Sequence, residues 1–275
     1  MRMVVKLAGA LLEDAGGMRA IAVQIAALAA GGHQLLVVHG GGKIFTATLA
    51  RMGIESRFIN GLRVTDRETR DAAVMVLGGL LNKRVAAAIT QAGRPAIGLC
   101  ASDAACFTAE PMALSEGGGS LGFVGYLTAA NVPFLESLWA AGVVPVAACL
   151  GLGPDGELYN INADHMAAAC AEFCSAERLI YLTDVAGVLE GKRVLKSVPC
   201  ARIEELIRSN RVSGGMVLKL EACRRALDGG VSQVHIVGGT LPHSLAAAAN
   251  GGRGPGTRVL AGFGAAAASA TAVSR

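Results

Sequence analysis

The stretch Gln34–Lys43 constrains the fold of this chain more than any other. An unbroken apolar run leads through His39 into three consecutive glycines and Lys43. Such a run is typical of a strand covered on both faces, and the residues from Ile44 to Met52 have the character of a helix. Glycines let backbone N–H groups approach an anion at a helix N-terminus, so the stretch predicts a phosphate cradle. A plain flexible turn between a strand and a helix is the alternative interpretation.

A similar junction precedes it in the chain. Val4–Leu7 predicts a strand that carries Lys6 near its end and runs into Ala8-Gly9-Ala10. Apolar residues recur at helical spacing between Met18 and Leu28, and Gly31-Gly32 ends that segment. A strand, a helix and a strand in succession imply parallel strands with a right-handed crossover. Both glycine turns are therefore expected at the same carboxyl edge of the sheet, where open α/β folds bind ligands.

Composition bounds the class of protein. The 275 residues are 52% hydrophobic, which is enough for a large core in one extended α/β domain or in two lobes. A net charge of +4 is scattered along the chain without interleaved aromatic residues, so no nucleic-acid partner is expected. No uninterrupted apolar run reaches the ~18 residues of a membrane span, so no membrane association is expected. The seven cysteines form no CxxC pair and predict free thiols in a reducing, cytoplasmic compartment.

The segment Arg57–Val64 predicts a hairpin, because Asn60-Gly61 is a turn signal between short apolar pieces. Arg63 would then be an exposed side chain on a lid, able to hold a carboxylate with two parallel hydrogen bonds. A solvated surface arginine is the alternative. The following Thr65–Glu68 has the pattern of a capping box and predicts a long helix that ends near Ala92.

The middle of the chain ends in a polar cluster. Pro95–Leu99 and Val143–Leu150 predict further strands, and Phe134–Ala141 predicts a helix closed by Gly142. The polar residues of Asn160–Asp164 then gather at the start of a helix. Capping explains one of these polar residues but not three, which favours a binding or catalytic site over capping alone.

The last third carries a second lysine of interest. Leu179–Thr183 predicts a strand that ends in the loop Asp184–Val188, and Ser213–Met216 opens a helix with Lys219 in its first turn. Helical side chains lean toward the N-terminus, so Lys219 would point at an anion bound there. Residues 203–208 predict a helix, and strands at 233–237 and 258–260 are expected to complete the sheet. The alanine-rich residues 262–275 are expected to form a loosely held tail.

Two phosphate-binding motifs fail. Gly42-Lys43 lacks the earlier glycine and the Ser or Thr of a P-loop, and the GxGxxG spacing of Gly117, Gly119 and Gly122 has no strand before it. Six other motifs occur together and in order between Lys6 and about Leu260, and in combination they resemble those of the acetylglutamate kinases, in the amino acid kinase family. They are Lys6-Leu7-Ala8-Gly9, His39-Gly40-Gly41-Gly42, Gly61-Leu62-Arg63-Val64-Thr65, Asn160-Ile161-Asn162-Ala163-Asp164, Thr183-Asp184-Val185-Ala186-Gly187-Val188, and Gly214-Gly215-Met216 with Lys219.

The resemblance implies a fold and a division of the chain. The fold would be a three-layer α/β/α sandwich around a mainly parallel open sheet. Residues 1–175 would form the amino-acid-binding lobe, which also carries a dimer interface. Residues 176–262 would form the nucleotide-binding lobe, followed by the tail at 263–275.

The resemblance also implies a reaction and its residues. ATP, with Mg²⁺ on its phosphates and no metal site of the protein's own, would phosphorylate the side-chain carboxylate of N-acetyl-L-glutamate, a step of arginine synthesis. Lys6, Lys219, Asp164 and Gly9 would be catalytic, and Gly41, Gly42, Arg63 and Asn160 would bind the substrate. Nine residues would line the nucleotide site: Asp184, Val185, Ala186, Gly187, Val188, Leu189, Arg211, Val212 and Ser213.

Departures from the family pattern and alternatives accompany this expectation. Ala8 replaces a common glycine, and Ala101-Ser102-Asp103-Ala104 replaces a glycine-richer segment. Arginine-inhibited relatives carry an extra N-terminal helix, and without it we expect an arginine-insensitive homodimer. A sibling kinase acting on N-succinylglutamate or on carrier-linked aminoadipate or glutamate, and a non-catalytic amino-acid or nucleotide sensor, are the alternative functions. A dehydrogenase would rest on the GxGxxG spacing alone.

Overall fold

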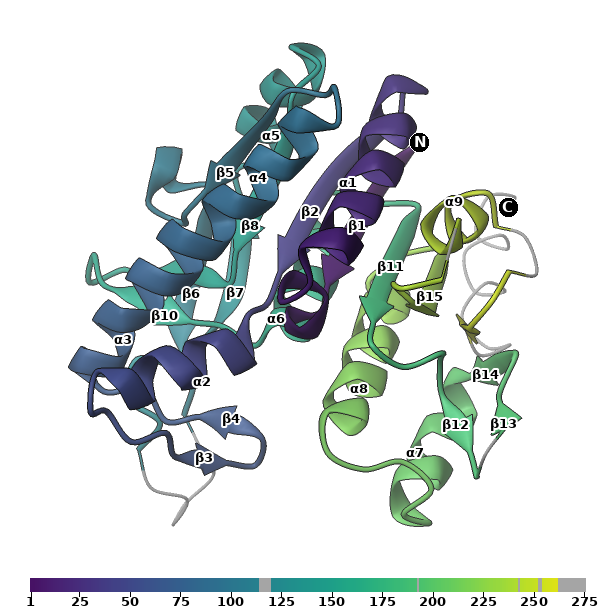
Figure 1. Ribbon diagram of the computed structural model, residues 1–275. Helices are drawn as coiled ribbons and strands as arrows, with labels where there is room; N and C mark the ends of the chain where they lie inside the picture. The colour runs from purple at the N-terminus through teal and green to yellow at the C-terminus, as the bar shows by residue number, and fades with distance from the viewer. Residues whose placement is uncertain (114–119, 192, 242, 252–253, 262–275) are drawn as a thin grey trace, which may run out of the picture.

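A single eight-stranded sheet joins the early and late parts of the chain (Figure 1). The computed structural model describes residues 1–113, 120–191, 193–241, 243–251 and 254–261. In spatial order the strands are β14 (Ser197–Pro199), β16 (Thr257–Leu260), β15 (Gln233–Gly238), β11 (Arg178–Thr183), β1 (Arg2–Leu7), β2 (Gln34–His39), β8 (Val144–Ala148) and β5 (Ala96–Leu99). The six strands from β15 to β5 are parallel. Strand β16 runs antiparallel to β15, and β14 is parallel to β16.

Helices cover both faces of this sheet. Alternate residues of a strand point to opposite faces, so β1 sends Met3, Val5 and Leu7 to one core and Val4 to the other. The first core is covered by α1 (Ala15–Ala30), α4 (Asn82–Gln91) and α9 (Ser244–Ala249). The second is covered by α5 (Val132–Ala140), α6 (Ala163–Phe173), α7 (Cys200–Arg208) and α8 (Gly215–Asp228). The expected three-layer sandwich with a mainly parallel sheet is confirmed.

One long helix passes along the side of the sheet near β5. It comprises α3 (Arg67–Ala73), a π-helical segment η2 (Val74–Leu81) and α4, and it confirms the helix expected to end near Ala92. By length and composition Arg67–Gln91 could span a membrane, but half of its most apolar window is buried inside this protein. The π-helical segment packs into the second core through Leu77 and Leu81, and α4 packs into the first core through Val85 and Ile89.

Smaller strands lie in the half of the molecule that carries β2, β8 and β5 (Figure 1). A four-stranded sheet has the order β10 (Leu158–Asn160), β9 (Leu150–Leu152), β6 (Phe107–Pro111), β7 (Gly125–Ala130). The hairpin β3–β4 (Phe58–Ile59 and Leu62–Arg63) turns through Asn60 and Gly61, which both have positive φ, as expected for this turn. The remaining elements are α2 (Gly42–Arg51), the 3₁₀ turns η1 (Gly9–Leu12) and η3 (Asp103–Ala105), and the hairpin β12 (Leu189–Glu190) and β13 (Arg193–Val194).

The sequence predicted the central strands better than the outer ones. The strands expected at 4–7, 34–39, 95–99, 179–183, 233–237 and 258–260 are all present, and the one expected at 143–150 is divided between β8 and β9. Strands β6, β7, β10 and β12–β14 were not predicted, nor was α9. Gly117, Gly119 and the tail at 262–275 lie outside the described residues. The division of the chain near residue 176 stays a prediction.

Candidate functional site

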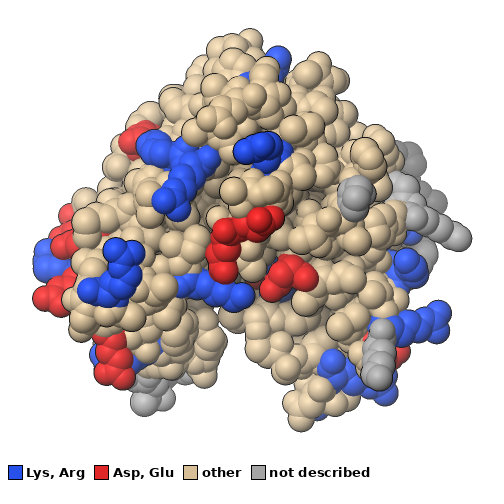
Figure 2. All heavy atoms as spheres, in the orientation of Figure 1, with Lys and Arg blue, Asp and Glu red and all other residues tan. Residues whose placement is uncertain are grey.

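The candidate site lies at the carboxyl edge of three adjacent strands. Strand β1 carries Lys6, β2 runs into Gly40–Gly42, and β11 runs into Asp184, and these strands are neighbours in the sheet. Figure 2 shows the molecular surface deeply notched between the half that carries α2 and β3–β4 and the half that carries α7 and α8 in Figure 1. Segments far apart in the sequence therefore meet at one edge, as the strand–glycine pattern predicted.

Lys6, Asp164 and Lys219 form the centre of this site. The Nζ atoms of Lys6 and Lys219 each lie 2.8 Å from Oδ1 of Asp164, so one carboxylate oxygen bridges two ammonium groups. All three residues are at most 8% exposed. Two cations and one anion leave the cluster with a net positive charge. Because that excess charge is buried, it attracts an anion more strongly than the same charges would in water.

The same contacts set the protonation of the carboxylate. Burial alone would favour the neutral acid, but the two ammonium groups outweigh it and lower the pKa of Asp164 to about 2. Burial also lowers the pKa of Lys219, with a smaller contribution from Lys6, while Asp164 opposes both effects. At neutral pH Asp164 is therefore an anion, and it is engaged as a bridge between the lysines.

Helix α6 fixes the position of Asp164. The side chain of Asn162 caps this helix by accepting hydrogen bonds from the backbone N–H of Asp164 (2.9 Å) and of His165 (3.2 Å). The Tyr181 hydroxyl donates to the carbonyl of Asp164 at 3.0 Å, and the Tyr181 ring faces Lys219 Nζ at 4.9 Å. An acidic residue in a first helical turn is also stabilised by the helix dipole. Within Asn160–Asp164, Asn162 therefore caps the helix, and Asp164 pairs with the two lysines.

Gly9, Gly41 and Gly42 form a tight backbone cradle beside Lys6. A Cβ placed on Gly9 would lie 3.0 Å from the nitrogen of Gly41 and 3.1 Å from that of Gly42. A Cβ on Gly41 would lie 2.3 Å from Leu81. Helix α2 begins at Gly42, so its free N–H groups open toward the same place. Close packing therefore requires glycine at two of these positions, against backbone at Gly9 and against the side chains of Leu77 and Leu81 at Gly41, whereas a Cβ on Gly42 would meet nothing.

Arg63 occupies the other end of the same pocket, and the expectation of an exposed arginine is wrong. Its side chain is buried, because the guanidinium lies between the rings of Phe45 (4.8 Å) and Phe58 (4.6 Å). It donates to the hydroxyls of Ser56 and Thr46. Burial lowers the pKa of Arg63, which nevertheless remains a cation at neutral pH.

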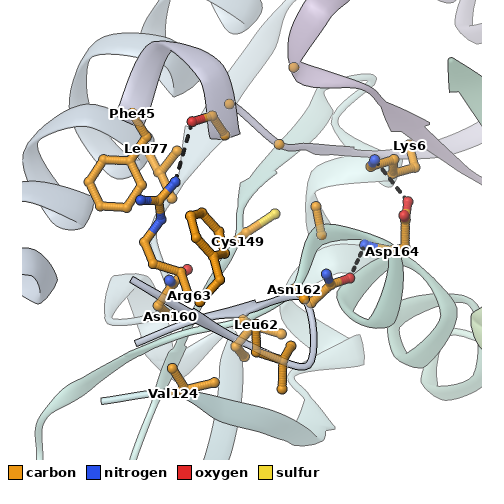
Figure 3. Close-up of a pocket in the computed structure, with 18 residues that line it drawn as sticks. Lys6, Phe45, Leu62, Arg63, Leu77, Val124, Cys149, Asn160, Asn162 and Asp164 are labelled. Atoms are coloured by element: carbon orange, nitrogen blue, oxygen red, sulfur yellow. Dashed lines mark hydrogen bonds and ion pairs between the residues drawn. The ribbon is translucent and has the colours of Figure 1, made fainter. Parts of the chain in front are cut away.

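A cavity of about 230 Å³ connects Arg63 to Lys6 (Figure 3). Asn160 lies on its wall with its Nδ2 donating to the Thr65 hydroxyl at 3.1 Å. In Figure 3 Arg63 and Asn160 lie on one side of the pocket, and Lys6 and Asp164 on the other. The described lining residues are Lys6, Gly9, Gly40, Gly41, Gly42, Phe45, Phe58, Gly61, Leu62, Arg63, Leu77, Val124, Cys149, Asn160, Ile161, Asn162, Ala163 and Asp164.

The two segments expected to bind a nucleotide follow β11 and precede α8, in the half of the molecule that carries α7 and α8 (Figure 1). The loop after β11 contains Asp184, Val185, Ala186 and Gly187, then the buried Val188 and the exposed Leu189. The second segment, before α8, contains Arg211, the buried Val212 and the exposed Ser213. Arg211 pairs with Glu190 at 2.6 Å, and Val188 and Val212 belong to one core, so the structure brings the segments together. The backbone of Val188 is bonded inside the protein, since its N–H donates to the Thr257 hydroxyl and its carbonyl accepts from the N–H of Leu195.

Several contributors to this site escaped sequence reasoning. Phe45, Thr46, Ser56 and Phe58 hold Arg63, and Cys149 lines the cavity near Lys6. No motif marks them, although Phe45 and Thr46 lie in the first turns of α2, three and four residues after Gly42. Within the described ranges, no three His, Cys, Asp or Glu side chains are grouped as a metal site. The arrangement is chemically suited to hold two anions against each other, with cations at both ends and backbone N–H donors between them.

Comparison with known proteins agrees with this geometry. The model of the family described as "Amino acid kinase family" matches residues 1–238. The acetylglutamate kinase of Koribacter versatilis is 51% identical over 246 residues, which cover 89% of this chain and 93% of that protein. The acetylglutamate kinase of Acidobacterium capsulatum is 44% identical, over 95% of this chain and 100% of its own length. A solved structure of smu.665 from Streptococcus mutans UA159 is 28% identical with a TM-score of 0.81, and the match covers 94% of this chain and 98% of that one.

Proposed function

The chain belongs to the amino acid kinase family, and we propose that it transfers the γ-phosphoryl group of ATP to the side-chain carboxylate of N-acetyl-L-glutamate. The product would be N-acetyl-L-glutamyl 5-phosphate, in arginine biosynthesis. The observation that carries this proposal is the pair of lysine ammonium groups on one oxygen of Asp164, beside the cradle of Gly9, Gly41 and Gly42.

The proposed reaction needs charge stabilisation and no general base. A side-chain carboxylate with a pKa near ~4.3 is already ionised at neutral pH, so its oxygen attacks the γ-phosphorus directly. The bond from that phosphorus to the bridging oxygen breaks, and ADP leaves with the electron pair. Lys6 and Lys219 would then neutralise charge on the transferring group, and the N–H groups of Gly9, Gly41 and Gly42 would hold its oxygens. Asp164 would orient the two lysines, since both ammonium groups are hydrogen-bonded to it.

The two substrates would enter from opposite sides of this centre. Arg63 would bind the α-carboxylate of acetylglutamate, because its guanidinium is buried in the same cavity and is fixed by Phe45 and Phe58. Asn160 would bind near the acetamido group. The segments 184–189 and 211–213 would line the nucleotide, and Lys219 would reach its phosphates from helix α8. The Mg²⁺ of MgATP would be held by phosphates and water, since Asp164, the one carboxylate among the described residues that line the cavity, is already bound to two lysines.

A coupled ADP-release assay tests the substrate. We expect turnover with acetylglutamate to exceed turnover with N-succinylglutamate, aspartate and glutamate. Background rates with acetylglutamate would contradict the proposal. Clearly faster turnover of succinylglutamate would indicate a sibling kinase.

A lysine variant distinguishes an enzyme from a binding protein that has lost turnover. We expect Lys219→Ala to lower kcat by at least about 10²-fold, while acetylglutamate binding, measured by calorimetry, weakens only a few-fold. The matched control is Lys196→Ala, which removes an exposed lysine. If both quantities fell equally in the Lys219 variant, the sensor would be the better assignment.

We further propose that the enzyme is a cytoplasmic homodimer. The seven cysteines are all free in the structure, which suits a reducing compartment. Met75 and Leu80 are 55% and 44% exposed on the long helix beside the edge strand β5, and this apolar face supports a two-fold contact between copies.

A further inference from the structure

His39 is a fully buried histidine that the proposed reaction does not use directly. It is the last residue of β2 and is followed at once by the glycine cradle. Its Nδ1 lies 2.9 Å from the carbonyl oxygen of Gly40, and its Nε2 lies 3.2 Å from Nδ2 of Asn82. Asn82 is also fully buried and follows the π-helical segment of the long helix. A chain of two side chains thus connects that helix to the backbone of the cradle.

The partners of Asn82 determine which nitrogen of His39 carries the proton. Nδ2 of Asn82 lies 2.9 Å from the carbonyl oxygen of Val146, and only an N–H group can make that contact. The same NH₂ group therefore donates to Nε2 of His39, which must be an acceptor. The proton of the neutral ring is then on Nδ1, from which it is donated to Gly40. Burial lowers the pKa of His39 to about 4, which keeps the ring neutral near pH 7.

The hydrogen bond from His39 to the carbonyl of Gly40 sets the direction of the Gly41 N–H group. The peptide between Gly40 and Gly41 is trans and planar, so its C=O and N–H point in opposite directions. When His39 holds the carbonyl of Gly40, the N–H of Gly41 must point away from His39. The nitrogen of Gly41 lies on the side of Gly9, as the 3.0 Å approach to a Cβ on Gly9 demonstrates.

The long helix holds both ends of this connection. Leu77 and Leu81 of the π-helical segment pack directly on Gly41, and Asn82 is the next residue in the helix. Asn82 itself has little freedom, because a Cβ on Gly98 would lie only 2.0 Å from its Oδ1. Segments of π-helix inside α-helices occur frequently at functional sites.

We propose that Asn82 and His39 are positioning residues that aim the N–H of Gly41 at the transferring phosphoryl group. This inference rests on the proposed kinase function. It adds that the amide is effective only while Nδ1 of His39 donates to Gly40. The pair acts through the backbone and touches no substrate.

Two substitutions of His39 separate its two hydrogen bonds. In His39→Asn the side-chain amide can place an N–H near the position of Nδ1, which preserves the donor to Gly40. In His39→Gln the longer side chain reaches the position of Nε2, which preserves the contact with Asn82 and removes the donor to Gly40. We expect kcat of His39→Asn to stay within about fivefold of wild type and kcat of His39→Gln to fall about 10²-fold, as when one donor to a developing anion is removed. The KM values for ATP and acetylglutamate should change less than about threefold in both variants.

The matched controls are His235→Asn and His235→Gln, since His235 is a second buried histidine, on β15 of the same sheet. Both should retain wild-type kcat, and thermal unfolding should show similar losses of Tm for all four variants. Equal loss of kcat in both His39 variants, or a loss that follows Tm, would overturn the proposal. If the wild-type protein itself showed no turnover, the proposed function would fail, and ¹⁵N NMR of the His39 ring would still test the inference. Protonation at Nδ1 supports it, and protonation at Nε2 overturns it.

Discussion

Asp164 is the residue on which the balance of charge in this site depends. Removing Lys219 leaves one ammonium group on one carboxylate, whereas removing the carboxylate leaves two buried cations without their partner. We therefore expect Lys219→Met to lower the free energy of unfolding by less than about 1 kcal/mol and Asp164→Asn to lower it by about 3–5 kcal/mol. Urea unfolding measures both values, and both variants should lose kcat. A larger loss of stability in Lys219→Met than in Asp164→Asn would contradict the assigned bridge.

The same carboxylate predicts a pH dependence of stability. The pKa of Asp164 is lowered to about 2 in the folded protein and is near 3.8 in the unfolded chain. Its contribution is therefore fully present above about pH 4 and is lost as the pH falls toward 2. Urea unfolding of wild type and Asp164→Asn between pH 5 and pH 2.5 measures this effect. The difference between the two proteins should shrink by about 2 kcal/mol over that range, and a constant difference would contradict the lowered pKa.

At the level of elements, the N-terminal cap of α6 is predicted to matter for stability and for catalysis. Asn162→Ala removes an acceptor for two N–H groups and should lower the free energy of unfolding by about 1 kcal/mol. Because the same cap orients the turn that carries Asp164, kcat should also fall. Asn131→Ala is the matched control, since Asn131 caps α5 through Phe134, away from the cavity. It should lose similar stability and keep its kcat; equal kcat values in the two variants would contradict a role for the α6 cap.

The elements that the sequence predicted well share a physical property. Strands β1, β2 and β11 are covered on both faces, so they are mostly apolar, with Lys6 as the buried exception in β1, and the glycines after β1 and β2 mark the cradle. The unpredicted strands β6 and β10 mix apolar with polar residues, and their pairing depends on partners elsewhere in the chain. Periodicity cannot report such pairing.

Side-chain burial in the site was likewise beyond the sequence. The charged side chain of Arg63, on a hairpin, was expected to be exposed. It is buried because the rings of Phe58 and of Phe45, which is distant in the sequence, lie against it. The hydrogen bond from Asn82 to His39 joins two elements that are 43 residues apart in the sequence, and no sequence pattern indicates that these two side chains meet. The order of motifs predicted which segments converge, and the three-dimensional structure was needed to find what supports them.

The molecule as a whole is predicted to form a dimer through the face that carries Met75 and Leu80. Size-exclusion chromatography with light scattering should give twice the 27.9 kDa chain mass. A charge on this apolar face would have to be desolvated at the contact, so Leu80→Glu should yield monomers. Leu241→Glu, at an exposed leucine of the other half, should remain dimeric. A wild-type monomer, or a dimer that survives Leu80→Glu, would contradict the proposed interface.

The position of β1 between β2 and β11 has a consequence during translation. While the ribosome has not yet released Arg178–Thr183, a nascent chain can pair β1 on one side only, and its other edge is open to wrong partners. Lys6 can meet Asp164 soon after α6 emerges, but the second ammonium group arrives only with α8. A growing polypeptide therefore remains without activity until nearly all of its sheet has been made.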